Sequence, residues 1–233
     1  MEYLCIIKVM PYRKIPIVTE EIYHIFNRSV ASQPIFLDKW DYKRALEVMQ
    51  FYCFQNPGIR YSYYNRLQTD LKTSFWNDLI KHGKKQVMLL TFCFMFNHFH
   101  FLLKELEENG IKTFISNFQN SYAKYFNTKT ERKGAVFLSM FKGVRIATDE
   151  QLIHVSRYIH LNPLTSYVIK NTNDLETYQW SSYVDYLGIR NKGIVDKELV
   201  MGLLKTTQKF KNFTLDQKDY QRELEKIKHL SFD

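Results

Sequence analysis

The pattern of apolar and polar residues in the first quarter of the chain predicts one strand followed by one helix. Residues 21–30 alternate between apolar and polar, with β-branched and aromatic members, which is typical of a half-buried strand. Residues 38–54 place apolar side chains at helical spacing, and Asp38 stands where a helix cap is expected. The Asn-Pro-Gly sequence at 56–58 should end this helix.

Two apolar runs in the middle of the chain predict a pair of adjacent strands. They cover residues 86–96 and 99–103, and Asn97 lies at a tight corner between them. The preceding segment, 59–85, is polar and aromatic, and a short helix is expected around residues 74–81. We interpret this segment as an insertion between the first helix and the next strand.

Two further helices and one more extended segment follow. Residues 110–127 carry a single apolar stripe at helical spacing, and residues 149–162 begin with acidic residues that suit a helix N-terminus. Pro163 disfavours helical backbone at the residue before it, so the second helix should end there or earlier. Residues 135–147 are expected to be extended, with a break at Gly143.

The order of these elements predicts an α+β fold. The simplest arrangement is an antiparallel sheet of the ferredoxin-like type with the helices packed on one face. Residues 1–190 are expected to form this domain, including the insertion at about 59–85. Residues 191–233 are expected to form a helical C-terminal extension.

Composition narrows the class of partner and the compartment. The chain has 33 Lys+Arg against 24 Asp+Glu, a net charge of +9, which favours polyanions and nucleic acid first. Three scattered cysteines form neither a disulfide framework nor a zinc motif, and they fit a reducing cytosol. The apolar N-terminal run is too short to span a membrane and lacks the order of a signal peptide. We therefore expect a cytoplasmic protein without membrane contact.

The sequence His98-Phe99-His100 is a candidate metal site. Residues i and i+2 of a strand point to the same face, so the two imidazoles should stand side by side. Paired imidazoles can hold a divalent ion, and the apolar residues on both sides indicate a rigid, central element. Because this motif is short, two partly buried histidines without a metal are the alternative.

A second candidate lies in residues 157–163, at the end of the last predicted helix of the domain. Tyr158 and Asn162 are four residues apart, so one helical face offers a phenol and an amide oxygen. A phenol with a pKa of about 10 is a weak nucleophile at neutral pH, and a metal bound to the attacked phosphate offsets that weakness. Arg157 could neutralise a neighbouring phosphate. Packing of Tyr158 and capping by Asn162 explain the same residues without chemistry.

Taken together, these segments resemble the HUH single-tyrosine transposases, and most closely the REP-associated branch with its IS200-like transposase domain. The family usually has Pro where this chain has Phe96. The resemblance spans roughly residues 20–190 but covers neither 59–85 nor the tail. Five stretches occur in the family's order, at 23–28, 96–103, 134–137, 157–163 and 180–183.

The resemblance implies a role for each matched residue. His98 and His100 would bind the metal, and Tyr158 would attack a DNA phosphate and become linked to its 5′ end. Asn162 matches a position that supplies a third polar ligand and is often Gln in relatives. The expected ion is Mg²⁺ or Mn²⁺, and the expected activity is cleavage and strand transfer of single-stranded DNA beside hairpins. Relatives act as monomers or as homodimers, so the oligomeric state stays open.

Further residues are candidates for DNA contact or for a supporting role. Tyr122 and Tyr125 are rival nucleophiles, although both fit the apolar stripe of residues 110–127, which favours packing. His24 is a candidate neighbour of the histidine pair within the sheet. The expected DNA contacts are Arg157, His154, Arg28, Lys142 and Arg145.

Two other functions remain open. An inactive or domesticated descendant would bind hairpin nucleic acid without cutting it. An RNA-binding sheet of the ferredoxin-like class would instead need exposed aromatic side chains on the sheet. Metal-dependent covalent attachment to DNA would separate the transposase from both.

Overall fold

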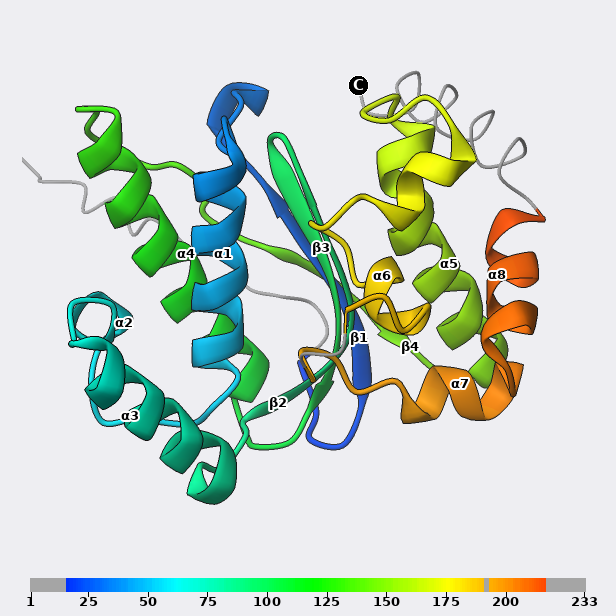
Figure 1. Ribbon diagram of the computed structural model, residues 1–233, viewed down its shortest axis with the longest axis horizontal. Coiled ribbons are helices and arrows are strands. Elements are labelled where there is room, and N and C mark those ends of the chain that lie inside the picture. Colours follow the sequence, from blue (N-terminus) through cyan, green and yellow to red (C-terminus); the bar gives the residue numbers. More distant parts are fainter. Residues whose placement is uncertain (1–15, 191–192, 217–233) are drawn as a thin grey trace, which may run out of the picture.

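A four-stranded antiparallel sheet forms the centre of the computed structural model, which describes residues 16–190 and 193–216 (Figure 1). The spatial order of the strands is β2-β3-β1-β4, and every neighbouring pair is antiparallel. This order confirms the predicted α+β class and the ferredoxin-like topology. The strands are β1 (Ile22–Arg28), β2 (Val87–Met95), β3 (His98–Glu105) and β4 (Lys142–Ile146).

Helices α1 (Lys39–Tyr52) and α4 (Gly110–Lys129) pack together on one face of the sheet (Figure 1). The ring centroids of Phe99 and Phe101 on β3 lie 5.2 and 5.4 Å from that of Phe118 on α4. The apolar stripe predicted for residues 110–127 is therefore the surface that α4 buries against the sheet.

Helix α5 (Asp149–Thr165) covers the opposite face, so the prediction that all helices pack on one face is wrong (Figure 1). The reason is visible in β2, whose side chains are buried on both faces of the sheet. A strand buried on both sides reads as a continuous apolar run, as residues 86–96 do, and it needs a cover on each face. Helix α5 supplies the second cover.

A buried carboxylate joins α1 to α4. Asp41, which is fully buried, accepts hydrogen bonds from the Leu37 backbone N–H at 2.9 Å and the Tyr125 hydroxyl at 2.9 Å. The Lys129 ammonium lies 2.6 Å from the same carboxylate and 2.8 Å from that of Asp38, which caps α1 as predicted. A buried charge is tolerated only when it is paired and hydrogen-bonded, and these partners satisfy that condition.

The remaining helices are short, apart from one in the predicted insertion. That segment holds α2 (Tyr61–Tyr64) and α3 (Thr69–His82), where only a helix around 74–81 was expected. Beyond α5, the helices α7 and α8 pack against it, whereas residues 217–233 of the predicted extension lie outside the described residues. The other helices are η1 (Val30–Ser32), η2 (Thr172–Glu176), α6 (Tyr183–Tyr186), α7 (Glu198–Leu204) and α8 (Thr207–Leu215).

Two local predictions differ from the structure. Gly143 lies inside β4 instead of breaking it, and α5 continues through Pro163 to Thr165. Proline removes only one backbone donor, and near the end of a helix the last carbonyls lack helical partners in any case. Leu161 and Leu164 are fully buried there, so tertiary packing outweighs the local preference.

Residues 180–182 cover the outer edge of β2 and fasten α5 to the sheet. The Phe94 N–H donates to the Trp180 carbonyl at 2.9 Å. The Ser182 hydroxyl accepts from the Phe92 N–H at 2.9 Å and lies 2.8 Å from Nε2 of His160 on α5. One hydroxyl therefore links the edge strand to the helix that carries Tyr158.

We expect Ser182→Ala to lower the free energy of unfolding by about 1–3 kcal/mol, because it leaves the buried Phe92 N–H and the His160 ring without a partner. Urea denaturation followed by circular dichroism measures the loss. Ser116→Ala, at an exposed position on α4, is the matched control and should change little. Equal stability of Ser182→Ala and the unsubstituted protein would contradict this account.

Candidate metal and tyrosine site

The two histidines of β3 point away from α4 and toward α5. Phe99 between them is fully buried against α4, so the alternation of the strand sends His98 and His100 to the other face. Their ring centroids are 5.1 Å apart and the rings are nearly perpendicular. Buried β2 lies directly beside them, with Cys93 opposite His100 in the register. The same-face arrangement expected for the His98-Phe99-His100 motif is present.

Helix α5 brings Tyr158 and Asn162 to the same place. The Tyr158 ring is partly buried, and its centroid lies 5.6 Å from that of His100. Asn162, one turn later, is 1% exposed, and its side chain hydrogen-bonds His98. The four residues that the sequence selected for chemistry thus converge from one strand and one helix.

The side chain of Asn97 fixes the orientation of His98. The amide nitrogen of Asn97 donates to the Ser32 carbonyl at 2.9 Å, so its oxygen is the atom that lies 2.6 Å from Nδ1 of His98. An oxygen acceptor at this distance requires that Nδ1 carry the ring proton. In the neutral ring, Nε2 then holds a lone pair, which is the form that binds a metal.

The donor set around Asn162 fits a cation. Its amide nitrogen donates to the Tyr158 carbonyl at 3.1 Å, and its side chain also hydrogen-bonds His98. Nδ1 of His98 is engaged by Asn97, so Nε2 is the nitrogen on this side. Imidazole nitrogens and an amide oxygen are both atoms that divalent cations accept as ligands. His98, His100 and Asn162 therefore suit a divalent ion.

The electrostatic surroundings keep His98 neutral. Burial is the largest effect and lowers the pKa of His98 from 6.5 to about 4. The hydrogen bond with Asn162 raises the pKa, and the positive charge of Arg28 lowers it further. At neutral pH the imidazole is therefore available to a metal without first losing a proton.

His24 on β1 belongs to this cluster. Its Nε2 lies 2.9 Å from Nδ1 of His100, and its ring centroid lies 5.9 Å from that of Tyr158. The ring of Phe26 packs against the imidazoles of His24 and His100. The alternation of residues 21–30 was visible in the sequence, but the register that places His24 beside His100 depends on the pairing of β1 with β3.

Arg157 and His154 face α8 instead of the histidine pair. The guanidinium of Arg157 lies 4.4 Å over the ring of Phe213 and 2.6 Å from Nδ1 of His154, and Arg157 is only 4% exposed. The ring of His154 also packs on Phe213. The buried position of Arg157 corrects its prediction as a DNA contact, because its charge holds α8 in place.

The three other basic candidates divide between the two faces of the sheet. Arg28 is opposite His98 and Lys142 is opposite Phe26, and directly opposed residues share a face, so both belong to the histidine face. Both are exposed. Arg145 is opposite Tyr23, on the other face, where it pairs with Glu21 at 3.0 Å. Arg145 is therefore not on the same side as the histidines.

The rival tyrosines are held in the α4 layer on the far side of the sheet. The buried Tyr122 donates its hydroxyl to the Ile35 carbonyl at 2.5 Å, and Tyr125 donates to Asp41. Burial and the neighbouring Asp41 carboxylate raise the pKa of Tyr125 to about 12. Both tyrosines are thus packing residues, as the apolar stripe favoured.

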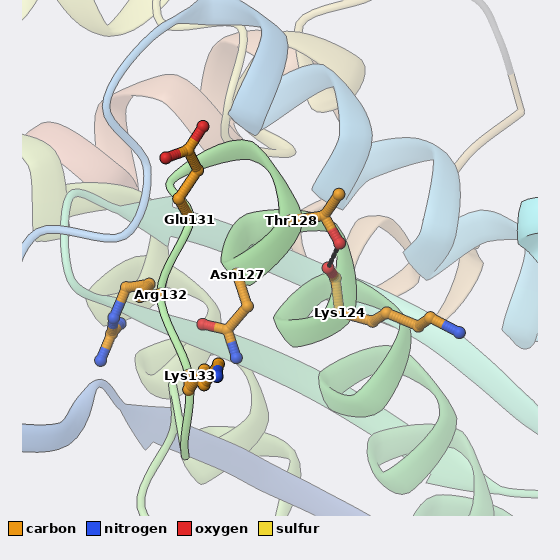
Figure 2. A pocket seen from close by; sticks show the side chains of 6 residues that line it. All are labelled: Lys124, Asn127, Thr128, Glu131, Arg132 and Lys133. Carbon is orange, nitrogen blue, oxygen red and sulfur yellow. Dashed lines mark hydrogen bonds between the residues drawn. The ribbon is translucent and has the colours of Figure 1, made fainter.

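A separate surface hollow of about 380 Å³ lies at the C-terminal end of α4 (Figure 2). Three basic side chains and one acidic side chain line it, together with two polar residues. Because α4 covers the face opposite the histidines, this hollow does not belong to the site. Its lining residues are Lys124, Asn127, Thr128, Glu131, Arg132 and Lys133.

Clusters of metal-binding side chains are commonly formed by His, Cys, Asp and Glu. Within residues 16–190 and 193–216, no group of three or more His, Cys, Asp or Glu side chains is placed to hold an ion.

Residues 60–162 match the sequence model of a family described as IS200-like transposases. This segment is similar to an IS200-like transposase domain. The matched segment includes His98, His100, Tyr158 and Asn162, and its description agrees with the IS200-like domain expected from the motifs. It also includes nearly all of the segment 59–85, which the five motifs leave out.

The remaining comparisons found a distantly similar solved structure and no curated relative. A solved structure of a REP-associated tyrosine transposase bound to a REP hairpin is 12% identical, with a TM-score of 0.48. The alignment covers 80% of this chain and 88% of that one. No curated protein matches the sequence. Among the described helices, none is both long and apolar enough to cross a membrane.

We expect the imidazole of His98 in the metal-free protein to titrate near pH 4, measured by NMR of the ring nitrogens. Arg28→Ala should raise this pKa, because removal of a nearby positive charge favours the protonated ring. His160 is the control: burial lowers its pKa to about 3, so Arg28→Ala should leave it unchanged. A His98 midpoint at 6.5 or above would contradict the packing described here.

Proposed function

We propose that the transposase domain cleaves and rejoins single-stranded DNA with Tyr158 as the nucleophile, beside a divalent ion held by His98, His100 and Asn162. One observation carries the proposal. Two imidazoles from β3 and an amide and a phenol from α5 meet on one face of the sheet, although these elements are far apart in the sequence. The matched family model includes all four residues.

The proposed step is a transesterification. The Tyr158 oxygen attacks a backbone phosphorus, the bond from phosphorus to O3′ breaks, and a 5′-phosphotyrosine forms. The phenol loses its proton, and the departing O3′ takes up a proton to become a free 3′-hydroxyl. Because no water is consumed, a second 3′-hydroxyl can attack the phosphotyrosine and rejoin the strand.

The protein's own groups set up this step before any ion binds. Asn97 keeps Nδ1 of His98 protonated, and the contact of Asn162 with the Tyr158 carbonyl fixes the amide oxygen. A bound divalent ion would act as a Lewis acid on the attacked phosphate and would orient it. Two imidazole ligands suit Mn²⁺ better than Mg²⁺, although either ion is compatible with the amide oxygen.

The DNA backbone is proposed to run across the histidine face of β1 and β4. Helix α5 packs mainly over β2 and β3, so its cover is concentrated on the other half of the sheet. Arg28 and Lys142 lie on this half and are exposed. Their charges can neutralise phosphates on either side of the attacked one. Single-stranded DNA next to a hairpin remains the substrate that the sequence resemblance implies.

Binding of nucleic acid without cleavage is the second candidate. It is favoured by the net charge of +9, which needs no chemistry to attract DNA. A function in RNA binding is less well supported, because Phe99 and Phe101 are fully buried against α4 and cannot stack on bases.

A covalent adduct tests the proposed function. With Mn²⁺ and single-stranded DNA carrying hairpins with varied flanks, the protein should form an adduct that survives a denaturing gel. Tyr158→Phe should abolish it, because the attacking oxygen is removed, and chelation should do the same. His98→Ala and His100→Ala should each reduce adduct formation by at least about 100-fold.

Tyr125→Phe is the matched control, since it removes a phenol from the opposite side of the sheet and should leave the adduct intact. DNA binding without any adduct would favour the binding-only function. An adduct that persists in Tyr158→Phe would assign the nucleophile to a different tyrosine.

The path of the DNA makes a separate prediction. Arg28→Ala and Lys142→Ala should each weaken single-strand binding and reduce the slope of log K against log salt by about 0.7. Arg145→Ala removes the same charge from the other face and should leave the slope unchanged. Fluorescence anisotropy in a salt series measures all three. If Arg145→Ala has the larger effect, the DNA runs over the α4 face.

A further inference from the structure

We propose that His24 is a positioning residue that accepts the Nδ1 proton of His100 and thereby makes His100 present a lone pair on Nε2. This inference rests on the proposed function, since it concerns the ion that His98, His100 and Asn162 would hold. It concerns β1, which lies before the segment that matches the family model.

The contact between the two rings is close and shielded. Nε2 of His24 lies 2.9 Å from Nδ1 of His100, and the residues are 8% and 6% exposed. The rings are stacked at 24° with centroids 5.1 Å apart, and Phe26 lies against both. The hydrogen bond is therefore formed in a site where water competes little.

A hydrogen bond between two neutral imidazole nitrogens has two forms. If His24 donates, Nδ1 of His100 holds the lone pair and Nε2 carries the proton, so Nε2 cannot bind a metal. If His100 donates, its Nε2 carries the lone pair, which is the form that a ligand bond requires. The second form requires that the proton of His24 sit on Nδ1, and a metal on Nε2 of His100 would select it.

Asn97 orients the ring of His98 in the way that His24 is proposed to orient the ring of His100. The oxygen of Asn97 engages Nδ1 of His98, as Nε2 of His24 engages Nδ1 of His100. Each imidazole thus has a partner on Nδ1 that directs Nε2 to the metal side. The amide oxygen of Asn97 can only accept, whereas Nε2 of His24 accepts when the ring proton of His24 is on Nδ1, which is the form proposed for His24.

His24 is not a third metal ligand in this arrangement. Its Nε2 is already engaged by Nδ1 of His100, and the proposal assigns the ion to the other nitrogen of that ring, Nε2. No group of three histidines or acidic residues within the described part of the chain is placed to hold an ion, which agrees with an indirect role.

Two variants of the full chain separate positioning from packing. His24→Phe keeps a ring against Phe26 but cannot accept a hydrogen bond, whereas His24→Gln offers an oxygen close to the position of Nε2. The readout is the Mn²⁺ dissociation constant of the DNA-free protein, from the electron paramagnetic resonance signal of free Mn²⁺. We expect His24→Phe to weaken binding by about 10–100-fold and His24→Gln to restore most of it.

The tautomer is measured independently of the metal. With ring-¹⁵N histidine, the nitrogen shifts of His100 in the metal-free protein should show the Nδ1–H form, and His24→Phe should remove that preference. A folded His24→Phe protein with unchanged Mn²⁺ affinity and an unchanged His100 tautomer would overturn the proposal. So would His24→Gln behaving like His24→Phe, or an unsubstituted His100 that carries its proton on Nε2.

Failure of the proposed function gives a different result. If the unsubstituted protein binds Mn²⁺ no more tightly than His98→Ala, the metal site is wrong, whatever His24 does. The His100 tautomer still decides whether His24 orients that ring. Thermal unfolding of each variant shows whether a loss of binding follows from a loss of fold.

Discussion

The alternation of side chains along β3 is the constraint on which the rest of the structure depends. Phe99 and Phe101 enter the core against α4, and the residues between and beside them are thereby sent to the other face. A shift of one residue in the pairing of β3 would exchange the faces and bury the histidines in an aromatic core. The apolar side of this strand therefore fixes the position of the polar site.

The position of Tyr158 depends on how α5 is fastened to the sheet. The hydroxyls of Thr91 and Ser156 lie 3.1 Å apart in the interface between β2 and α5. One turn after Ser156, the ring of His160 meets the Ser182 hydroxyl, which is bonded to the edge of β2. These hydrogen bonds are directional, so they fix the rotation of α5 about its own axis as well as its distance from the sheet. A nucleophile on such a helix needs little rearrangement before it reacts.

Periodicity along the sequence predicted the features that depend on a single helix or strand. It failed for the features that depend on contacts between two such elements. The stripe of α4, the cap at Asp38 and the same-face placement of His98 and His100 follow from spacing along one segment. The side on which α5 packs, the direction of Arg157 and the neighbour of His100 depend on contacts between segments, which no local pattern encodes. Continuation of α5 through Pro163 belongs to the second group, because burial of Leu161 and Leu164 opposes the local preference.

His160 and His98 show why a lowered pKa does not by itself identify a metal ligand. Burial lowers the pKa of His160 to about 3 and that of His98 to about 4, so both rings are neutral at physiological pH. Nε2 of His160 is engaged by the Ser182 hydroxyl, and aromatic rings from α6 and α8 pack against the imidazole. His98 instead has its Nδ1 engaged by Asn97 and lies beside His100 and Asn162, whose side chains can also bind a cation. The arrangement of partners, and not the shift in pKa, distinguishes the histidine that holds the fold from the one suited to chemistry.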